Sequence, residues 1–310
     1  REVYRSETFP GFAYTFTVPG LFVQDEIGFS SELRASASLR WDAHSEYGSH
    51  LSPRVSALYR PGPWTARVSV GGGFFAPTPF VEEIEAAGLS RLAPVEGLRA
   101  ERAWTASVDV GRTIRDVELN ATLFGSRVED AVHLLPLDDG VEATGVRLAN
   151  VEGETRTMGT ELLARYRWED LTLTGSYVFV RSTEPDPTTP RRRDVPLTPR
   201  HTAGLVAMWE DHDLGLLGVE AYYTGRQVLD GSPYRDEGRP QVHLGILGEL
   251  RRGDYSVFLN AENLLNVRQT RYDPLIRDQR APDGRWTVDA WAPLEGFTLN
   301  GGVRVRLGGH

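Results

Sequence analysis

The side chains that could carry out chemistry are few and scattered along the 310-residue chain. The seven histidines show no metal-ligand spacing such as H-x-x-x-H. His44 and His50 share one predicted loop with Asp42 and Glu46, which would suit a ligand or a metal ion, although polar residues are ordinary in loops. Ser45 lies between His44 and Glu46, but neighbouring residues at a strand end point apart, so they predict no catalytic triad. We therefore expect no catalytic residues, no metal ion and no cofactor.

Three further motifs are better explained by structure than by chemistry. Residues 138–140, Asp-Asp-Gly, are a turn signal, because the spacing of a calcium-binding loop is absent. Residues 71–73 are glycines, but no Gly-Lys-Ser/Thr follows, so they predict a bend or a close approach within a strand. Residues 191–193 are arginines, which we interpret as a solvated or lipopolysaccharide-facing loop cluster, with a specific ligand role as the alternative.

Composition excludes several classes of protein. The chain has no cysteine, and therefore no disulfide framework, no thiolate zinc site and no cysteine nucleophile. Its 43 acidic residues outnumber 34 basic ones, all of which are arginine, and the net charge of -9 argues against general nucleic-acid binding. No uncharged apolar run approaches the roughly 18 residues that a membrane-spanning helix needs.

The elements that would position these residues are predicted by alternation. Residues 33–42 alternate apolar and polar side chains, and so do residues 117–123, 171–179 and 297–307. Successive side chains of a strand point to opposite faces, so each segment predicts a strand with one apolar face. We expect about thirteen strands on this pattern, at 20–30, 32–44, 51–60, 64–76, 101–113, 116–134, 146–168 (its outer part in a hairpin), 171–183, 199–210, 214–226, 240–251, 254–268 and 297–307. Residues 80–92 alone suggest a short helix, inside a loop.

Short and long connections alternate between these strands. The short ones fall near 30–32, 61–63, 113–115, 169–170, 211–213 and 252–253, and the long ones near 45–50, 77–100, 135–145, 184–198, 227–239 and 269–296. Outer-membrane barrels have this arrangement, with short periplasmic turns and longer extracellular loops. Many strands run about 11–13 residues, which exceeds the soluble mode of about 5–6 and suffices for a tilted membrane strand.

The two faces of the predicted strands also suit a wide membrane barrel. Aromatic residues lie near strand ends, where interfacial girdles form, although aromatic residues are common in any strand. Charged residues on the polar face would be prohibitive in a dry core, but they are tolerable in a wet lumen or against a plug. Representative aromatic residues are Trp41, Trp64, Trp104, Trp168 and Trp209, and representative charged residues are Arg34, Arg67, Asp109, Glu118, Glu161, Arg165, Glu249 and Arg304.

Short motifs follow one another in a fixed order along these strands. Ser52-Pro53-Arg54 is followed by Gly-Phe-Phe-Ala-Pro-Thr at residues 73–78. Further motifs occupy residues 21–26, 40–42, 150–161, 198–201 and 260–266. As an ordered set, covering roughly residues 20–307, they resemble the barrel of TonB-dependent outer-membrane receptors. One departure is Phe75, where that family usually has arginine.

The resemblance implies an all-β fold, an antiparallel up-and-down transmembrane β-barrel. About 13–14 strands would come from this chain, as part of a barrel of about 22 strands. Residues 20–310 would be its C-terminal portion, and residues 1–19 the remnant of an extracellular loop or, at 11–18, an extra strand. We recognise neither a plug domain nor a TonB-binding box. The chain also ends Leu307-Gly308-Gly309-His310, whereas the family commonly ends on an aromatic residue.

The function that the resemblance implies is TonB-dependent uptake of a scarce nutrient such as a ferric siderophore, haem or cobalamin, without enzymatic activity. The expected location is the outer membrane of the cell. Expected partners are the nutrient, outer-membrane lipid and lipopolysaccharide, and the TonB complex only where a plug is supplied; nucleic acid is not expected. Two alternatives stay open, a passive porin-like channel and the barrel half of a split receptor. Candidate ligand-binding residues on predicted extracellular loops are His44, Tyr47, His50, Phe80, Tyr234 and Trp286.

Overall fold

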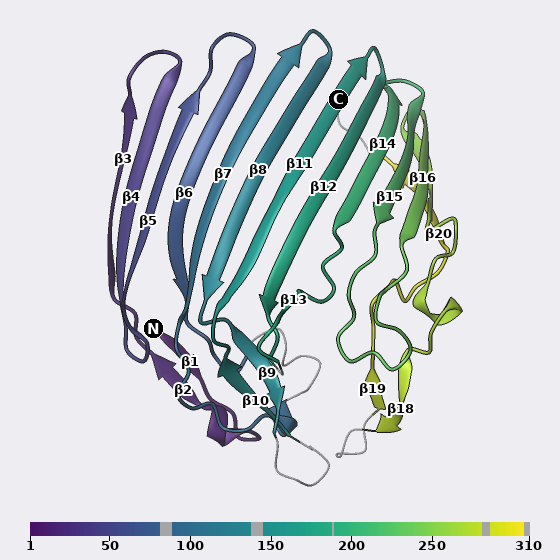
Figure 1. Ribbon diagram of the computed structural model, residues 1–310. Helices are drawn as coiled ribbons and strands as arrows, with labels where there is room; N and C mark the ends of the chain where they lie inside the picture. Colours follow the sequence, from purple (N-terminus) through teal and green to yellow (C-terminus); the bar gives the residue numbers. More distant parts are fainter. Residues whose placement is uncertain (81–88, 138–144, 188, 281–285, 307–310) are drawn as a thin grey trace.

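One antiparallel sheet dominates the computed structural model, which describes residues 1–80, 89–137, 145–187, 189–280 and 286–306 (Figure 1). Its main strands are β3 (Gly20–Gly28), β4 (Leu33–His44), β5 (Gly48–Tyr59), β6 (Trp64–Phe75), β7 (Glu101–Ile114), β8 (Val117–Glu129), β11 (Glu154–Trp168), β12 (Leu171–Pro185), β14 (His201–Asp211), β15 (Gly215–Thr224), β16 (Gln241–Arg252), β17 (Tyr255–Glu262) and β20 (Thr298–Val305). These strands neighbour one another in that order, and β13 (Arg192–Asp194) pairs with β12 as the fourteenth. The antiparallel all-β prediction and its strand number are confirmed.

Smaller elements gather at one end of this sheet, the lower end in Figure 1. Three hairpins lie there, β1 (Glu2–Tyr4) with β2 (Tyr14–Phe16), β9 (Val132–Pro136) with β10 (Val146–Asn150), and β18 (Ile276–Arg280) with β19 (Trp286–Val288). Short 3-10 helices occupy Pro10–Phe12, Leu89–Arg91 and Gln269–Arg271. Within the described ranges, no helix is long and apolar enough to cross a membrane.

The two ends of the sheet differ in their connections, as the sequence predicts. At the upper end of Figure 1 the strands are joined by tight turns, such as 115–116 and 169–170. Arg115 and Glu169 adopt positive φ angles of 51° and 49° there, which reverses the chain within two residues. We call the opposite end, with its hairpins and long connections, the loop end.

Some predicted boundaries are wrong, and backbone conformation explains them. The connection expected at 45–50 comprises only residues 45–47, because Gly48 (φ 80°) lets β5 begin earlier. The strand expected at 116–134 divides at Asp130 (φ 59°) into β8 and β9. The strand expected to reach residue 268 ends at Glu262, because Asn263 (φ 48°) leaves the extended region.

The predicted loop helix, the predicted turn and the glycine run can be compared with the structure only in part, because some of their residues lie outside the described ranges. Of the short helix suggested at 80–92, residues 81–88 lie outside the described part, and Leu89–Arg91 form a 3-10 helix. The turn expected at 138–140 also lies outside it. The glycines at 71–73 lie within β6, where a Cβ on Gly72 would approach the Trp104 ring to 3.2 Å. A close approach is thus confirmed at this run.

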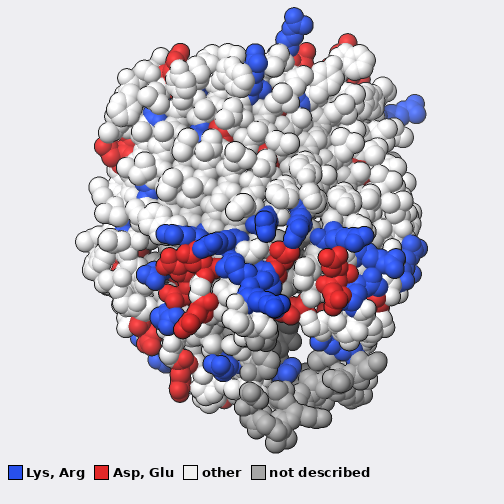
Figure 2. Space-filling model, viewed as in Figure 1, with Lys and Arg blue, Asp and Glu red and all other residues white. Residues whose placement is uncertain are grey.

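Burial is inverted relative to a water-soluble protein. The buried hydrophobic residues of the described chain belong to the loops and the loop hairpins. They are Leu92, Ala100, Val132, Leu148, Leu229 and Trp291. The large sheet instead exposes one apolar face, for example Leu123 at 58% and Leu162 at 46%. Figure 2 shows this face as a broad, almost uncharged belt. So large an apolar surface requires an apolar environment or a partner.

The opposite face is polar and joined by side-chain contacts between strands. Asp109 accepts hydrogen bonds from Asn120 at 2.7 Å and Thr122 at 3.0 Å. Near the tight turns, Glu118 pairs with Arg165 and Arg167 at 3.6 and 3.3 Å. Paired charges of this kind are stable where water reaches them, so this face suits a wet lumen.

Candidate functional site

The candidate ligand residues from the first loops lie at the loop end, three of them in the β4–β5 hairpin. The ring of His44 is 5.0 Å from that of Tyr47. His50 shares a hydrogen bond of 3.0 Å with the Tyr47 carbonyl and stacks on Phe74 at 4.0 Å between ring centroids. Because β4 and β5 continue in register up to His44 and Gly48, this turn holds the three side chains together.

His44 stabilises the β4–β5 turn through hydrogen bonds. Its Nδ1 accepts hydrogen bonds from the backbone N–H groups of Glu46 and Tyr47, both at 3.2 Å. The residue is only 6% exposed. These contacts give His44 a structural role, since one ring nitrogen is already used and little of the ring faces solvent.

Aromatic rings from the β1–β2 hairpin join this turn. Phe16 lies 4.8 Å from His44 and 6.0 Å from Tyr47. Phe80 meets Tyr4 edge-on at 4.4 Å. We call the following set the aromatic cluster: Tyr4, Tyr14, Phe16, His44, Tyr47 and Phe80. Phe80 is 44% exposed, so its ring is open to a flat ligand.

The hydroxyls of Tyr14 and Tyr47 in the cluster are neutral donors. Burial, reinforced by a hydrogen bond to Glu2, raises the pKa of Tyr14 to about 12. Burial, with the nearby charge of Glu46, raises the pKa of Tyr47 to about 12. Tyr47 donates to the Pro77 carbonyl at 2.6 Å. At neutral pH these phenols orient the rings and do not supply the phenolate that would bind ferric iron.

We expect Tyr14 and Tyr47 to ionise about two pH units later than free tyrosine. Their folded pKa values, about 12, exceed the ordinary value of 10.0, so neutral phenols stabilise the fold fully below pH 10. That stability is lost as the pH rises from 10 towards 12. Ultraviolet difference spectra of the protein and of Tyr47→Phe measure it, and a late-ionising phase of unchanged amplitude in Tyr47→Phe would contradict the assignment.

The remaining candidates, Tyr234 and Trp286, belong to other loops. Tyr234 lies between β15 and β16, and Trp286 begins β19. Both are exposed, at 37% and 51% respectively. The structure therefore brings His44, Tyr47, His50 and Phe80 into one region and leaves these two outside the aromatic cluster.

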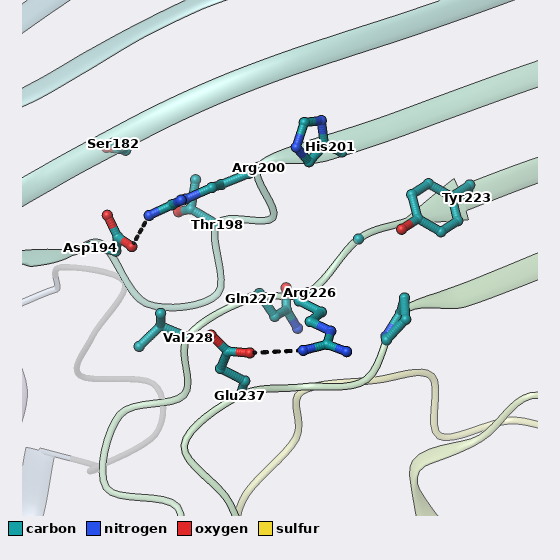
Figure 3. Close-up of a pocket in the computed structure, with 12 residues that line it drawn as sticks. Ser182, Asp194, Thr198, Arg200, His201, Tyr223, Arg226, Gln227, Val228 and Glu237 are labelled. Atoms are coloured by element: carbon teal, nitrogen blue, oxygen red, sulfur yellow. Dashed lines mark hydrogen bonds and ion pairs between the residues drawn. The ribbon is translucent and has the colours of Figure 1, made fainter.

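A second feature of the loop end is a polar pocket, shown in Figure 3, with a volume of about 390 Å³. Two ion pairs line it, Arg200 with Asp194 at 2.6 Å and Arg226 with Glu237 at 3.6 Å. The Arg226 and Glu237 side chains are 73% and 55% exposed, so this pair is weakly held and can be exchanged for a ligand. The pocket thus offers guanidinium donors to an anionic group.

Other polar side chains complete this pocket. The wall residues include Ser182, Thr198, His201, Tyr223 and Gln227, from β12, β14, β15 and the connections beside them. None of the six residues selected from the sequence lies in it. The only sequence signal was the Thr-Pro-Arg-His motif at 198–201, which contains three of its residues but did not indicate a pocket.

The pocket is supported by a buried polar block from the last long connection and the β15–β16 connection. Gln227 donates to the Trp291 carbonyl at 2.6 Å. The Trp291 indole donates to Asp273 at 3.1 Å, and Asp273 also pairs with Arg235 at 2.5 Å. Gln269, only 1% exposed, accepts from the Trp291 N–H at 2.7 Å. We call Arg235, Gln269, Asp273 and Trp291 the Trp291 block.

These arrangements offer groups that can bind a small molecule. Across the described ranges, no group of three or more His, Cys, Asp or Glu side chains is placed to hold a metal ion. The loop end offers aromatic rings and exchangeable guanidinium groups instead. Such groups recognise a flat or anionic small molecule.

Comparison with known proteins agrees with this architecture. A family model described as "TonB dependent receptor-like, beta-barrel" matches residues 3–304. Among curated proteins, none matches the chain in sequence.

Solved structures share the fold at low sequence identity. The ferric enterobactin receptor of Pseudomonas aeruginosa, in complex with BCV-L6, is 18% identical with a TM-score of 0.73, over 97% of this chain and 46% of that one. The siderophore receptor PirA of Acinetobacter baumannii is 13% identical with a TM-score of 0.69, over 94% and 46%. The ferric-catecholate import receptor Fiu of E. coli K12 is 14% identical with a TM-score of 0.64, over 93% and 44%. The chain therefore spans less than half the length of these receptors.

Proposed function

The chain belongs to the TonB-dependent receptor-like β-barrel family, and on that premise we propose that it forms part of the barrel and loops of an outer-membrane receptor for a scarce nutrient. The observation that carries this proposal is the combination of an exposed apolar strand face with a loop end built for binding. The apolar face meets lipid, the polar face lines the passage, and the loop end captures the nutrient outside the cell.

We further propose a ferric siderophore of the catecholate type as the nutrient. Receptors with this fold are named for ferric enterobactin and ferric catecholates. Catechol rings are flat and their ferric complexes are anionic, so they match exposed Phe80 and the guanidinium groups of Arg200 and Arg226. Haem and cobalamin are the competing nutrients, and direct binding separates them.

Further strands would complete the barrel. The edge strands β3 and β20 each pair with one neighbour and are not hydrogen-bonded to each other. Every residue of β3 is exposed, and lipid does not tolerate an unpaired strand edge. We therefore place residues 20–310 in the C-terminal portion of a wider barrel and residues 1–19 in an extracellular loop. TonB would act through a plug that this portion does not itself supply.

The orientation in the membrane is testable because the chain has no cysteine to interfere. We expect Thr189→Cys, at the loop end, to react with a membrane-impermeant maleimide on intact cells. His212→Cys, in a tight turn and with a 99% exposed side chain, should react only after the outer membrane is permeabilised. Equal labelling of both on intact cells, with the membrane shown to be sealed, would refute this orientation.

The function is tested with the intact receptor that contains this chain, purified in detergent. We expect tryptophan fluorescence to be quenched at micromolar or lower concentrations of ferric enterobactin, with weaker responses to haem and cobalamin. A preference for haem or cobalamin would overturn the catecholate assignment but would still support the proposed role as a nutrient receptor. Failure of all three, together with conductance in planar bilayers, would favour a passive channel.

A further inference from the structure

Four serines lie side by side on the polar face of the sheet, in one row across four neighbouring strands. Ser36 in β4 is in register with Ser56 in β5, and their hydroxyls are hydrogen-bonded at 2.8 Å. Ser69 in β6 continues the row from Ser56, and Ser107 in β7 continues it from Ser69. Alternation places Ser107 on the same face as Asp109, so the row belongs to the face that suits a wet lumen. We call these four serines the serine row.

Two arginines flank the serine row, one on each side. Arg54 lies two residues from Ser56, toward the loop end, and Arg67 lies two residues from Ser69, toward the tight turns. Both side chains share the face of the row and are exposed. Asp109 is in register with Arg67, but its hydrogen bonds go to β8. Among the described residues, neither guanidinium group has a hydrogen-bond or ion-pair partner.

Two adjoining hollows open onto this surface. One has a volume of about 750 Å³ and the other of about 290 Å³, and Arg54, Arg67 and Ser69 line both. Room for the Arg54 side chain over β6 comes from Gly71, where a Cβ would approach that side chain to 3.4 Å. A single ligand can span both hollows because they share these three side chains.

Positive charge prevails in the smaller hollow. Its charged lining residues are Glu26, Arg34, Arg54, Arg60 and Arg67. Glu26 pairs with Arg34 at 3.4 Å, which leaves the other three arginines without a carboxylate among the described residues. Guanidinium groups and serine hydroxyls both donate hydrogen bonds, so this surface suits an anion that is rich in oxygen acceptors.

The place of this surface along the strands selects among anions. It reaches from the middle of β5 to the tight-turn end, because Arg34 adjoins the turn at 29–32 and Arg60 lies in the turn at 60–63. The polar pocket at the loop end offers the same donor groups, through Arg200 and Arg226. A ligand that exchanges the ion pairs of that pocket therefore meets free guanidinium groups farther along the passage.

We propose that Arg54, Arg67 and the serine row form a second binding site, inside the lumen, for the anionic ferric catecholate on its way to the periplasm. The catecholate oxygens accept hydrogen bonds from the guanidinium groups and the serine hydroxyls, and the positive charge of the site offsets the negative charge of the complex. This site rests on the proposed function, since it takes the same nutrient, but it acts in passage and not in capture.

The test follows uptake by cells that carry the intact receptor, and fluorescence titration measures capture at the loop end separately. Ferric enterobactin is compared with the germanium(IV) complex of the same chelator, which has a lower negative charge. We expect Arg54→Gln/Arg67→Gln to lower the maximal uptake rate of the ferric complex about 10-fold, equivalent to the loss of one charge-assisted hydrogen bond, at an unchanged Kd. Uptake of the germanium(IV) complex should fall less, because a smaller charge gains less from the arginines.

Further variants control for charge and assembly. Arg165→Gln/Arg167→Gln removes the same charge from the polar face of β11, outside both hollows, and should take up both complexes as the parent does. Arg54→Lys/Arg67→Lys keeps the charge and should lose less than the glutamine variant. If the double variant is not assembled in the outer membrane, the single variants Arg54→Gln and Arg67→Gln should each lower uptake about threefold.

Each outcome decides the proposal. Unchanged uptake of the ferric complex by Arg54→Gln/Arg67→Gln, or an equal loss in the control, would overturn it. An equal loss for the two complexes would show that these arginines hold the plug or the wall and do not recognise the charge of the nutrient, which also overturns it, as does a raised Kd. If the parent neither captures nor takes up the ferric complex, the catecholate assignment fails and the lumen site falls with it. Capture and uptake by parent and variants alike remove only the lumen site.

Discussion

Replacing Trp291 with alanine should destabilise the last long connection by about 3–5 kcal/mol, the usual cost of deleting a buried tryptophan. Trp291 is 5% exposed, and its indole donates to Asp273. The substitution leaves a cavity and removes one hydrogen bond from a buried carboxylate that still faces Arg235. The Gln227 contact then loses its fixed acceptor, so the polar pocket should loosen as well.

Hydrogen–deuterium exchange over residues 263–297 and 225–240 measures this effect. We expect faster exchange in both segments of Trp291→Ala while β7, β8 and β11 keep their protection. Trp286→Ala is the matched control, because Trp286 is 51% exposed in the same connection and should change stability by no more than about 0.5 kcal/mol. Equal exchange in Trp291→Ala and the parent would show that this ring does not hold the block together.

Replacing Phe80 with alanine should raise the Kd for the ferric catecholate about 30-fold, which corresponds to about 2 kcal/mol at a binding hot spot. Phe80 presents the most exposed ring of the aromatic cluster, while Tyr4 supports it edge-on. Since the ring is 44% exposed in the free protein, its loss should affect the ligand more than the fold.

Fluorescence titration of the intact receptor measures this change, with Phe29→Ala as the control. Phe29 is 64% exposed but lies in a tight turn at the other end of the sheet. Its loss should leave the Kd unchanged. An unchanged Kd for Phe80→Ala, or equal weakening in both variants, would remove the aromatic cluster from the binding surface.

The strands and their faces could be predicted from the sequence because they depend on local chemistry. Alternation along residues 33–42 or 171–179 is complete within a single strand, so the apolar and polar faces follow without knowledge of any partner. Tight turns are equally local, and the connections at 169–170 and 252–253 lie within one residue of the observed ones. The predicted strand boundaries are wrong where a single positive φ angle ends a strand, as at Asp130 and Asn263.

The binding surface was only partly predictable. His44, Tyr47 and His50 come from one hairpin and are close in sequence, so their proximity follows from the turn that joins β4 to β5. Phe80 meets them through Tyr4 and the β1–β2 hairpin, which no alternation pattern encodes. The polar pocket and the Trp291 block were not predicted, because the block and most of the pocket residues lie in connections that have no repeating pattern.

By itself, the sequence determined an antiparallel all-β sheet with two unlike faces, tight turns at one end and elaborated connections at the other. Only the tertiary structure decided that Gln227 meets Trp291, that Phe80 meets Tyr4, and that Arg127 faces Arg156. The physical reason is the range of the interactions. Strand periodicity and turn geometry act over a few residues, whereas these contacts join distant segments, and their formation depends on strand register and on how each connection folds back over the end of the sheet.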